Sequence, residues 1–149
     1  NSDYNQVFVS LENNKIVLAE PEKAAWDISW SYSTSNSGLG SPYWIQDFVS
    51  INNLGGVTAV MVAKKDAYPT FAESDIAGLT FLPLKDVIGT SWRTAPDRNG
   101  VGGAVKGDLC YIIKDSAGNY YKLKFNSYIS GDGGERGKPV IEYKLVKKA

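Results

Sequence analysis

Hydrophobic and polar residues alternate with a period of two over much of this chain. Apolar side chains recur at every second position in residues 7–11, 26–32, 121–125 and 141–145. An antiparallel strand that has one face on a core and the other in water shows this period. The sequence therefore predicts an all-β fold, mainly of antiparallel sheets and hairpins, with one or two short helical turns.

Two further segments are apolar on both faces. Residues 57–63 read Val-Thr-Ala-Val-Met-Val-Ala, and residues 109–114 read Leu-Cys-Tyr-Ile-Ile-Lys. A strand that is covered on both sides carries such a run. Both segments are predicted to be strands, and residues 57–63 are predicted to be a central one.

Turn-forming residues separate these strands. Asn13-Asn14 is predicted to close a first hairpin and residues 116–119 a second, while residues 131–134 form a longer loop. Residues 33–42 and 94–103 are rich in Ser, Gly, Asn and Pro and are interpreted as long loops.

Helical signals are short. Ser74 is expected to cap a helix that ends at Gly78, and residues 83–88 are expected to form one turn that ends at Gly89.

The length and the net charge of the chain limit the classes of protein to which it can belong. The 149 residues suit a single domain over residues 1–149. Sixteen basic and sixteen acidic residues give no net charge, which argues against a nucleic-acid-binding protein. No apolar run approaches the ~18 residues of a membrane span. Because the sequence begins with Asn1 rather than Met, we expect either that a signal segment was removed before it or that the sequence was trimmed at this end.

The chain contains no histidine and a single cysteine, Cys110. Ser-His-Asp and Cys-His catalysis and His-containing zinc sites are therefore impossible, and one thiol cannot form a thiolate zinc site. A Ser-Lys or carboxylate-pair enzyme survives only in principle, so we expect a protein that is not an enzyme. Cys110 itself is expected to be a buried structural thiol.

Aromatic residues are the strongest candidates for ligand contacts. The chain has four Trp, nine Tyr and five Phe, and Tyr43, Trp44, Tyr68 and Trp92 fall in or beside loop-like segments. Such side chains suit a planar ligand or a sugar, although each of them also suits a loop anchor packed on the sheet. Met61 fits either core filling or a thioether ligand to haem iron.

Three motifs, taken together, resemble one family. They are the opening strand-turn-strand of residues 8–17, the sequence Trp-Asp-Ile-Ser-Trp of residues 26–30, and the Gly-punctuated meander of residues 111–145. This combination resembles the HmuY-like haem-binding proteins of Bacteroidetes. The resemblance implies a hand-like, all-β domain that clamps haem between loops. It also implies a surface lipoprotein of the outer membrane, anchored upstream of this sequence and able to be shed, which serves haem or iron acquisition with a receptor partner.

The chain departs from the family at the ligands. Members use a histidine pair or a methionine pair, and this chain has no histidine and one methionine. The family's Arg-Thr-Asn-Gly-Gly loop is replaced by Ser-Thr-Ser-Asn-Ser-Gly at residues 33–38, without the arginine. By position, the resemblance puts the ligand-bearing segments near residues 64–71 and 92–101.

These segments suggest a substitute site. Tyr68 phenolate would bind ferric iron, Arg93 or Arg98 would pair with a propionate, and Trp92 and Tyr43 would flank the macrocycle.

The resulting hypothesis is a non-enzymatic protein that binds haem or a related porphyrin with unusual or absent axial ligation. Three alternatives stay open. One is a relative of the same fold that binds iron-free porphyrin or no porphyrin. The second is a carbohydrate-binding surface module with an aromatic platform, and the third is a hydrolase.

Overall fold

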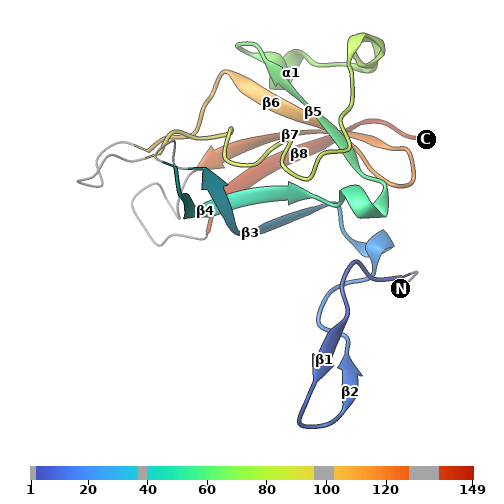
Figure 1. The fold of residues 1–149 in the computed structure, drawn as a ribbon. Helices are drawn as coiled ribbons and strands as arrows, with labels where there is room; N and C mark the ends of the chain where they lie inside the picture. The colour runs from blue at the N-terminus through green and yellow to red at the C-terminus, as the bar shows by residue number, and fades with distance from the viewer. Residues whose placement is uncertain (1–2, 37–39, 96–102, 128–137) are drawn as a thin grey trace.

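The computed structural model describes residues 3–36, 40–95, 103–127 and 138–149. In these residues the strands form three antiparallel sheets, β1–β2, β3–β4 and β5–β6–β7–β8 (Figure 1). The helical segments are short, which confirms the predicted all-β class. The strands are Phe8–Ser10 (β1), Lys15–Val17 (β2), Ile28–Asn36 (β3), Pro42–Ile51 (β4), Thr58–Ala63 (β5), Leu109–Lys114 (β6), Tyr120–Ser127 (β7) and Val140–Lys147 (β8); the helical turns are Lys23–Ala25, Asn53–Gly55, Ala67–Thr70 (α1) and Glu73–Gly78.

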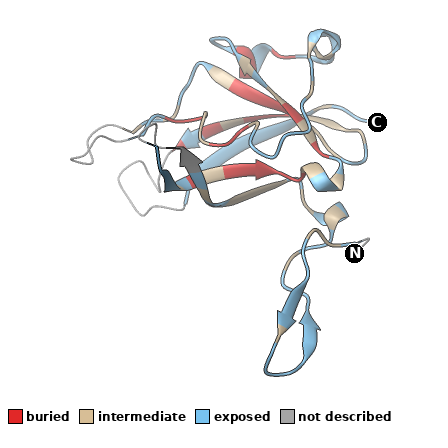
Figure 2. Cartoon of the chain, in the orientation of Figure 1, coloured by how far each residue is buried: buried red, intermediate tan, exposed pale blue. Residues whose placement is uncertain are grey.

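The four-stranded sheet is covered on both faces. Alternation along β6 sends Tyr111 and Ile113 to one side, where they pack against β3–β4, and Cys110 and Ile112 to the other, where they pack under α1. Figure 2 shows the buried residues concentrated where these layers meet. Cys110 is completely buried, in agreement with the prediction of a structural thiol.

β5 occupies an edge of its sheet, so the prediction of a central strand at residues 57–63 is wrong. Its two apolar faces have another cause: Ala59 packs in the core beneath β3–β4, whereas Val60 and Val62 pack toward α1. Ala59 also forms an isolated antiparallel bridge with Leu82, which covers part of this edge.

The predicted loop at residues 33–42 is shorter than expected, because β3 continues to Asn36 and β4 begins at Pro42. The ten-residue β4 was not predicted. Its alternation is broken by a bulge, since Ser31 pairs with Phe48 and Ser33 with Ile45, which leaves two residues of β4 opposite one of β3.

Of the two predicted helical turns, one is present and the other is not. Residues 73–78 form a 3-10 helix that ends at Gly78 as expected, but the side chain of Asp75, and not Ser74, accepts the cap hydrogen bond from the Ala72 N–H at 2.9 Å. The turn predicted at residues 83–88 is not helical, and Gly89 instead bridges to Val49. No described helix is long and apolar enough to cross a membrane.

Both predicted hairpin turns are present. Asn14 adopts the left-handed conformation (φ 47°) between β1 and β2. Gly118 does so (φ 92°) between β6 and β7, where Asp115 Oδ1 accepts from the Asn119 N–H at 2.8 Å. The loop predicted at residues 131–134 lies outside the described residues.

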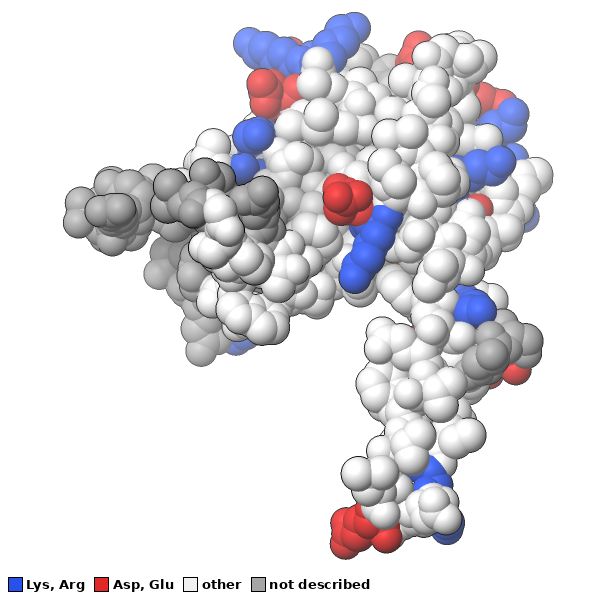
Figure 3. Space-filling model, viewed as in Figure 1, with Lys and Arg blue, Asp and Glu red and all other residues white. Residues whose placement is uncertain are grey.

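The β1–β2 hairpin projects from the body as an N-terminal arm (Figure 1). Its side chains are mostly exposed, and Figure 3 shows a largely uncharged surface with charges gathered at the tip. Two described contacts hold its base: Lys23 N–H donates to the Asp3 carbonyl at 2.7 Å, and Asn5 Nδ2 donates to Asn52 Oδ1 at 3.0 Å.

Candidate functional site

Tyr68 lies on α1, a single helical turn packed on the four-stranded sheet. The turn begins after Asp66, which is left-handed (φ 59°), and the Thr70 hydroxyl donates to the Asp66 carbonyl at 2.8 Å. Tyr68 is buried and belongs to the same core cluster as Cys110 and Ile112. The residue proposed from the sequence as an iron ligand is thus largely enclosed.

Two lysines of β7 lie over the Tyr68 ring. Lys124 Nζ is 4.9 Å from the ring centroid, and Lys122 Nζ is 5.3 Å from it. Lys122 is itself buried and donates to the Phe71 carbonyl at 2.9 Å. These distances are within the range of cation–π attraction, so the ring and both ammonium groups hold one another in place.

The Glu142 carboxylate of β8 lies near the Tyr68 hydroxyl and acts on it through its charge. Lys124 Nζ lies 3.0 Å from Glu142 Oε2. Burial and, after it, the charge of Glu142 raise the pKa of Tyr68, while hydrogen bonds from Lys124 and Asn126 lower the pKa of Glu142. At neutral pH the phenol is therefore protonated.

A polar pocket of about 220 Å³ opens beside Tyr68, where β6 begins and β7 ends. Three lysines and one acidic residue, Asp66, line it, and one of the lysines, Lys124, also pairs with Glu142. Such a charge balance suits an anionic group of a ligand. The lining residues are Lys64, Asp66, Ala67, Tyr68, Pro69, Lys106, Gly107, Leu109, Lys124 and Phe125.

The pocket also adjoins the second segment that the resemblance indicates. Lys106 N–H donates to the Trp92 carbonyl at 2.9 Å, and Phe125 stacks on Trp92 with ring centroids 4.4 Å apart. Trp92 is completely buried and does not line the pocket. The fold thus brings residues 64–71 and the beginning of residues 92–101 to one end of the sheet, with Lys106 and Phe125 between them.

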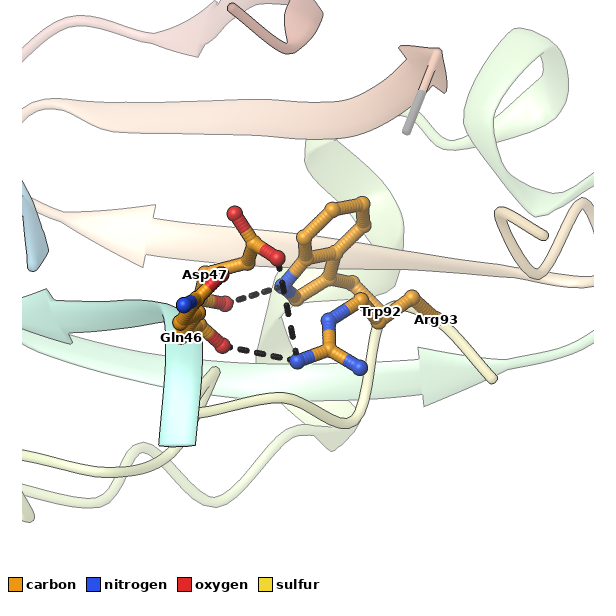
Figure 4. A network of polar contacts seen from close by, with 4 residues as sticks. All are labelled: Gln46, Asp47, Trp92 and Arg93. Carbon is orange, nitrogen blue, oxygen red and sulfur yellow. Dashed lines mark hydrogen bonds and ion pairs between the residues drawn. The ribbon is translucent and has the colours of Figure 1, made fainter. Parts of the chain in front are cut away.

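Arg93 belongs to an interior polar network (Figure 4). Its Nη2 donates to the Gln46 carbonyl at 2.7 Å and lies 4.0 Å from Asp47 Oδ2, while Trp92 Nε1 donates to the Asp47 carbonyl at 3.3 Å. Asp47 is left-handed (φ 58°) at the β4 bulge, which turns these two carbonyls toward the network. Arg93 is buried here and does not line the Tyr68 pocket.

The other predicted site residues are scattered. Met61 pairs in register with Tyr111, so it lies on the sheet face away from Tyr68, and 43% of it is exposed. Tyr43 is 46% exposed on β4. Neither lines the Tyr68 pocket. Arg98 lies outside the described residues.

The residues near Tyr68 differ in how they suit an iron atom and an acidic group. Burial and, after it, the charge of Glu142 raise the pKa of Tyr68, which opposes the phenolate form that binds iron. Met61 lies on the opposite face of the sheet. Lys64 and Lys106 line the pocket, where ammonium groups pair with carboxylates, and Lys124 lines it while also pairing with Glu142.

A second, more apolar groove of about 370 Å³ lies between β3 and the β7–β8 half of the large sheet. Burial and, after it, the charge of Asp115 raise the pKa of Asp27 at its rim. The groove exists because β3–β4 covers only part of the four-stranded sheet, a relationship that alternation within single strands does not reveal. Its lining residues are Asp27, Ile28, Ile113, Tyr121, Leu123, Ile141 and Tyr143.

Sequence reasoning missed the charged residues of the Tyr68 site. Alternation assigns Lys124 and Glu142 to the polar faces of their strands, where an ordinary solvated side chain is expected. Only the register, in which Lys124 pairs with Glu142, shows that the two meet beside Tyr68. Lys64 and Lys106 lie in connecting segments and carry no pattern that would have identified them.

Comparison with known proteins gives one match. The family model described as HmuY protein matches residues 2–143, which is nearly the whole chain. No curated protein and no solved structure matches. The matched span includes the opening hairpin, both sheets of the body except the end of β8, and the Tyr68 pocket, and the chain therefore belongs to the HmuY family.

Proposed function

We propose that this chain binds a porphyrin at the Tyr68 pocket and holds it by its carboxylates and ring edge rather than by an iron bond. The observation that carries the proposal is the convergence of Lys64, Lys106 and Lys124 beside Tyr68, at the place where the family resemblance puts the ligand-bearing segments. Membership of a haem-binding family supports the class of ligand.

Charge and size support this mode of binding. A porphyrin such as haem carries two propionates, and lysine ammonium groups pair with carboxylates as compact point charges. The pocket of about 220 Å³ is smaller than the ~300–1,000 Å³ typical of small-molecule sites. It therefore takes the acidic edge of the macrocycle, with Phe125 and the Tyr68 ring as apolar walls, while the rest of the ring lies outside it.

On this proposal the protein is a carrier and not an enzyme. It binds haem and iron-free porphyrin alike, because burial and the charge of Glu142 raise the pKa of the Tyr68 phenol and disfavour a phenolate ligand to iron. We extend to it the setting that the family suggests: a surface lipoprotein whose anchor lies outside this sequence, at the outer membrane or shed from it, which supplies a receptor in haem or iron acquisition.

Parallel titrations with ferric haem and iron-free protoporphyrin test the metal independence. We expect saturable binding of both, with dissociation constants within about a factor of three of each other, because no iron bond contributes. Binding of haem alone, with a spectrum of axially ligated iron that Tyr68→Phe abolishes, would contradict the proposal and restore Tyr68 as a ligand.

Variants that remove positive charges from the pocket test where the porphyrin binds. Replacing both Lys64 and Lys106 with Ala is expected to weaken the binding of either porphyrin by about ten-fold, since two ammonium–carboxylate contacts are lost. The double variant Lys15→Ala, Lys148→Ala makes the same change of net charge far from the pocket and serves as the control. Equal affinities for the two double variants would place the ligand elsewhere.

One observation favours a carbohydrate-binding function as a second candidate. Tyr32 is 65% exposed and Trp44 is 76% exposed, and Trp44 pairs with Thr34, two positions beyond Tyr32. Alternation puts these aromatic side chains on the same face of β3–β4, where they form a platform of the kind that stacks on sugar rings. Glycan-dependent quenching of tryptophan fluorescence that is lost in Trp44→Ala would support it.

A further inference from the structure

β8 is a long strand with an open edge. The order β5–β6–β7–β8 leaves no described strand on its outer side, whereas the opposite edge strand, β5, is partly covered by the bridge to Leu82. Alternate residues of such an edge present backbone N–H and C=O groups outward, ready to pair with another strand. Apolar side chains are also exposed along it, at Val140, Ile141, Tyr143 and Leu145.

The regular part of this strand has a symmetric pattern. Between the register shifts near its two ends, residues 141–145 pair without interruption with β7. They read Ile-Glu-Tyr-Lys-Leu, so an apolar residue stands at each end, an acid and a base flank the centre, and an aromatic residue is the centre.

We propose that β8 pairs with β8 of a second copy of this chain, antiparallel and centred on Tyr143. In this register Glu142 of each copy lies opposite Lys144 of the other, Ile141 lies opposite Leu145, and the two Tyr143 side chains meet at the two-fold axis. Opposite charges and apolar pairs directly across two strands stabilise a sheet. The two four-stranded sheets then form one continuous sheet with an isologous interface.

Other alignments of β8 with β8 of a second copy are less favourable. Centring on Glu142 sets two carboxylates against each other, and centring on Lys144 does the same with two ammonium groups. Parallel, in-register pairing opposes like charges at both positions, which destabilises a sheet. A register shifted by one residue puts charged side chains opposite apolar ones. Charge complementarity within the exposed edge therefore selects the second copy and one alignment.

The pairing completes the apolar groove. Ile141 and Tyr143 line the groove between β3 and the large sheet, and Tyr143 is 66% exposed in the single chain. Neighbouring strands lie about 4.8 Å apart. Leu145 and Tyr143 of the second copy would therefore border the groove of the first, and each copy would contribute side chains to the groove of the other.

Sedimentation equilibrium over a range of protein concentrations tests the pairing. The unchanged protein is expected to dimerise, and Lys144→Glu, which sets carboxylates opposite one another twice per dimer, is expected to weaken the dimer at least about ten-fold. Lys148→Glu makes the same change of charge beyond the end of β8 and should leave the dimer intact. Circular dichroism verifies that each variant is folded.

A mixing experiment tests the register itself. Glu142→Lys and Lys144→Glu should each be monomeric alone, and their equimolar mixture should form a heterodimer because unlike charges then face one another at both positions. An unchanged protein that is monomeric throughout would overturn the proposal. So would a Lys144→Glu variant that dimerises as well as Lys148→Glu, or a mixture that stays monomeric.

Discussion

The side chain of Asn5 donates to the side chain of Asn52 at 3.0 Å, and this bond ties the N-terminal arm to the body. Asn52 is buried and makes three more hydrogen bonds: its Nδ2 donates to the carbonyls of Lys23 and Trp26 at 2.7 and 2.8 Å, and its Oδ1 accepts from the Gly55 N–H at 3.0 Å. One amide therefore organises the entry to β3 and the end of β4.

Asn52→Ala should destabilise the protein by about 2–4 kcal/mol, because several buried backbone groups lose their partners at once. Urea unfolding measures the loss, and hydrogen exchange should show faster exchange around residues 23–26. Asn53→Ala, at the neighbouring position, is the control and should stay within about 0.5 kcal/mol of the original protein. Equal effects of the two substitutions would refute the role of Asn52.

Lys122→Met tests the buried cation under α1. The substitution keeps the volume but removes the donor to the Phe71 carbonyl and the cation over the Tyr68 ring. We expect a loss of about 2 kcal/mol in the free energy of unfolding. Lys65→Met, at an exposed position, makes the same chemical change and should have little effect. An unchanged urea midpoint for Lys122→Met would show that the cation contributes nothing.

The ionisation of Tyr111 makes the free energy of unfolding depend on pH in the alkaline range. Burial raises its pKa to about 12, although the hydrogen bond with Ser91 at 2.6 Å lowers it. In the unfolded chain the phenol ionises near pH 10, so the unfolded state loses its proton first and stability falls as the pH rises from about 10 to 12. Through this one group, the free energy of unfolding falls by roughly 1.4 kcal/mol between pH 9 and pH 11.

Tyr111→Phe should remove that part of the pH dependence, at a cost of about 1 kcal/mol at pH 7 for the lost hydrogen bond. Denaturant unfolding of both proteins at several pH values gives the difference. Parallel stability curves from pH 9 to pH 11 would argue against a raised pKa at Tyr111.

Gly118 and Gly107 form a matched pair of glycines. Gly118 is left-handed (φ 92°), and a Cβ there would lie 3.2 Å from the Cβ of Ala149. Gly107 has no such conformation, and a Cβ there would meet nothing within 4 Å. Gly118→Ala is therefore expected to cost about 1 kcal/mol or more, and Gly107→Ala to be neutral or slightly stabilising. The midpoint temperatures of thermal unfolding measure the two effects. A Gly107→Ala variant that is less stable than Gly118→Ala would contradict the prediction.

Local patterns predicted the strands well where alternation is unbroken. β3, β7 and β8 and the turns at Asn14 and Gly118 follow directly from period two and from turn chemistry. β4 escaped prediction because its bulge at Asp47 shifts the alternation halfway along. The position of β5 at an edge was also beyond reach, because coverage of both faces gives the same apolar run at an edge as at the centre.

The sequence by itself determined the all-β class, the family and the absence of histidine chemistry, because each of these depends on residue types and their order along the chain. Tertiary structure alone decided which side chains meet. It buried Trp92 and Arg93, brought Glu142 to Lys124 beside Tyr68 and gathered three lysines around one pocket. Strand register and layer packing fix such long-range neighbours, and neither can be read from spacing within one strand.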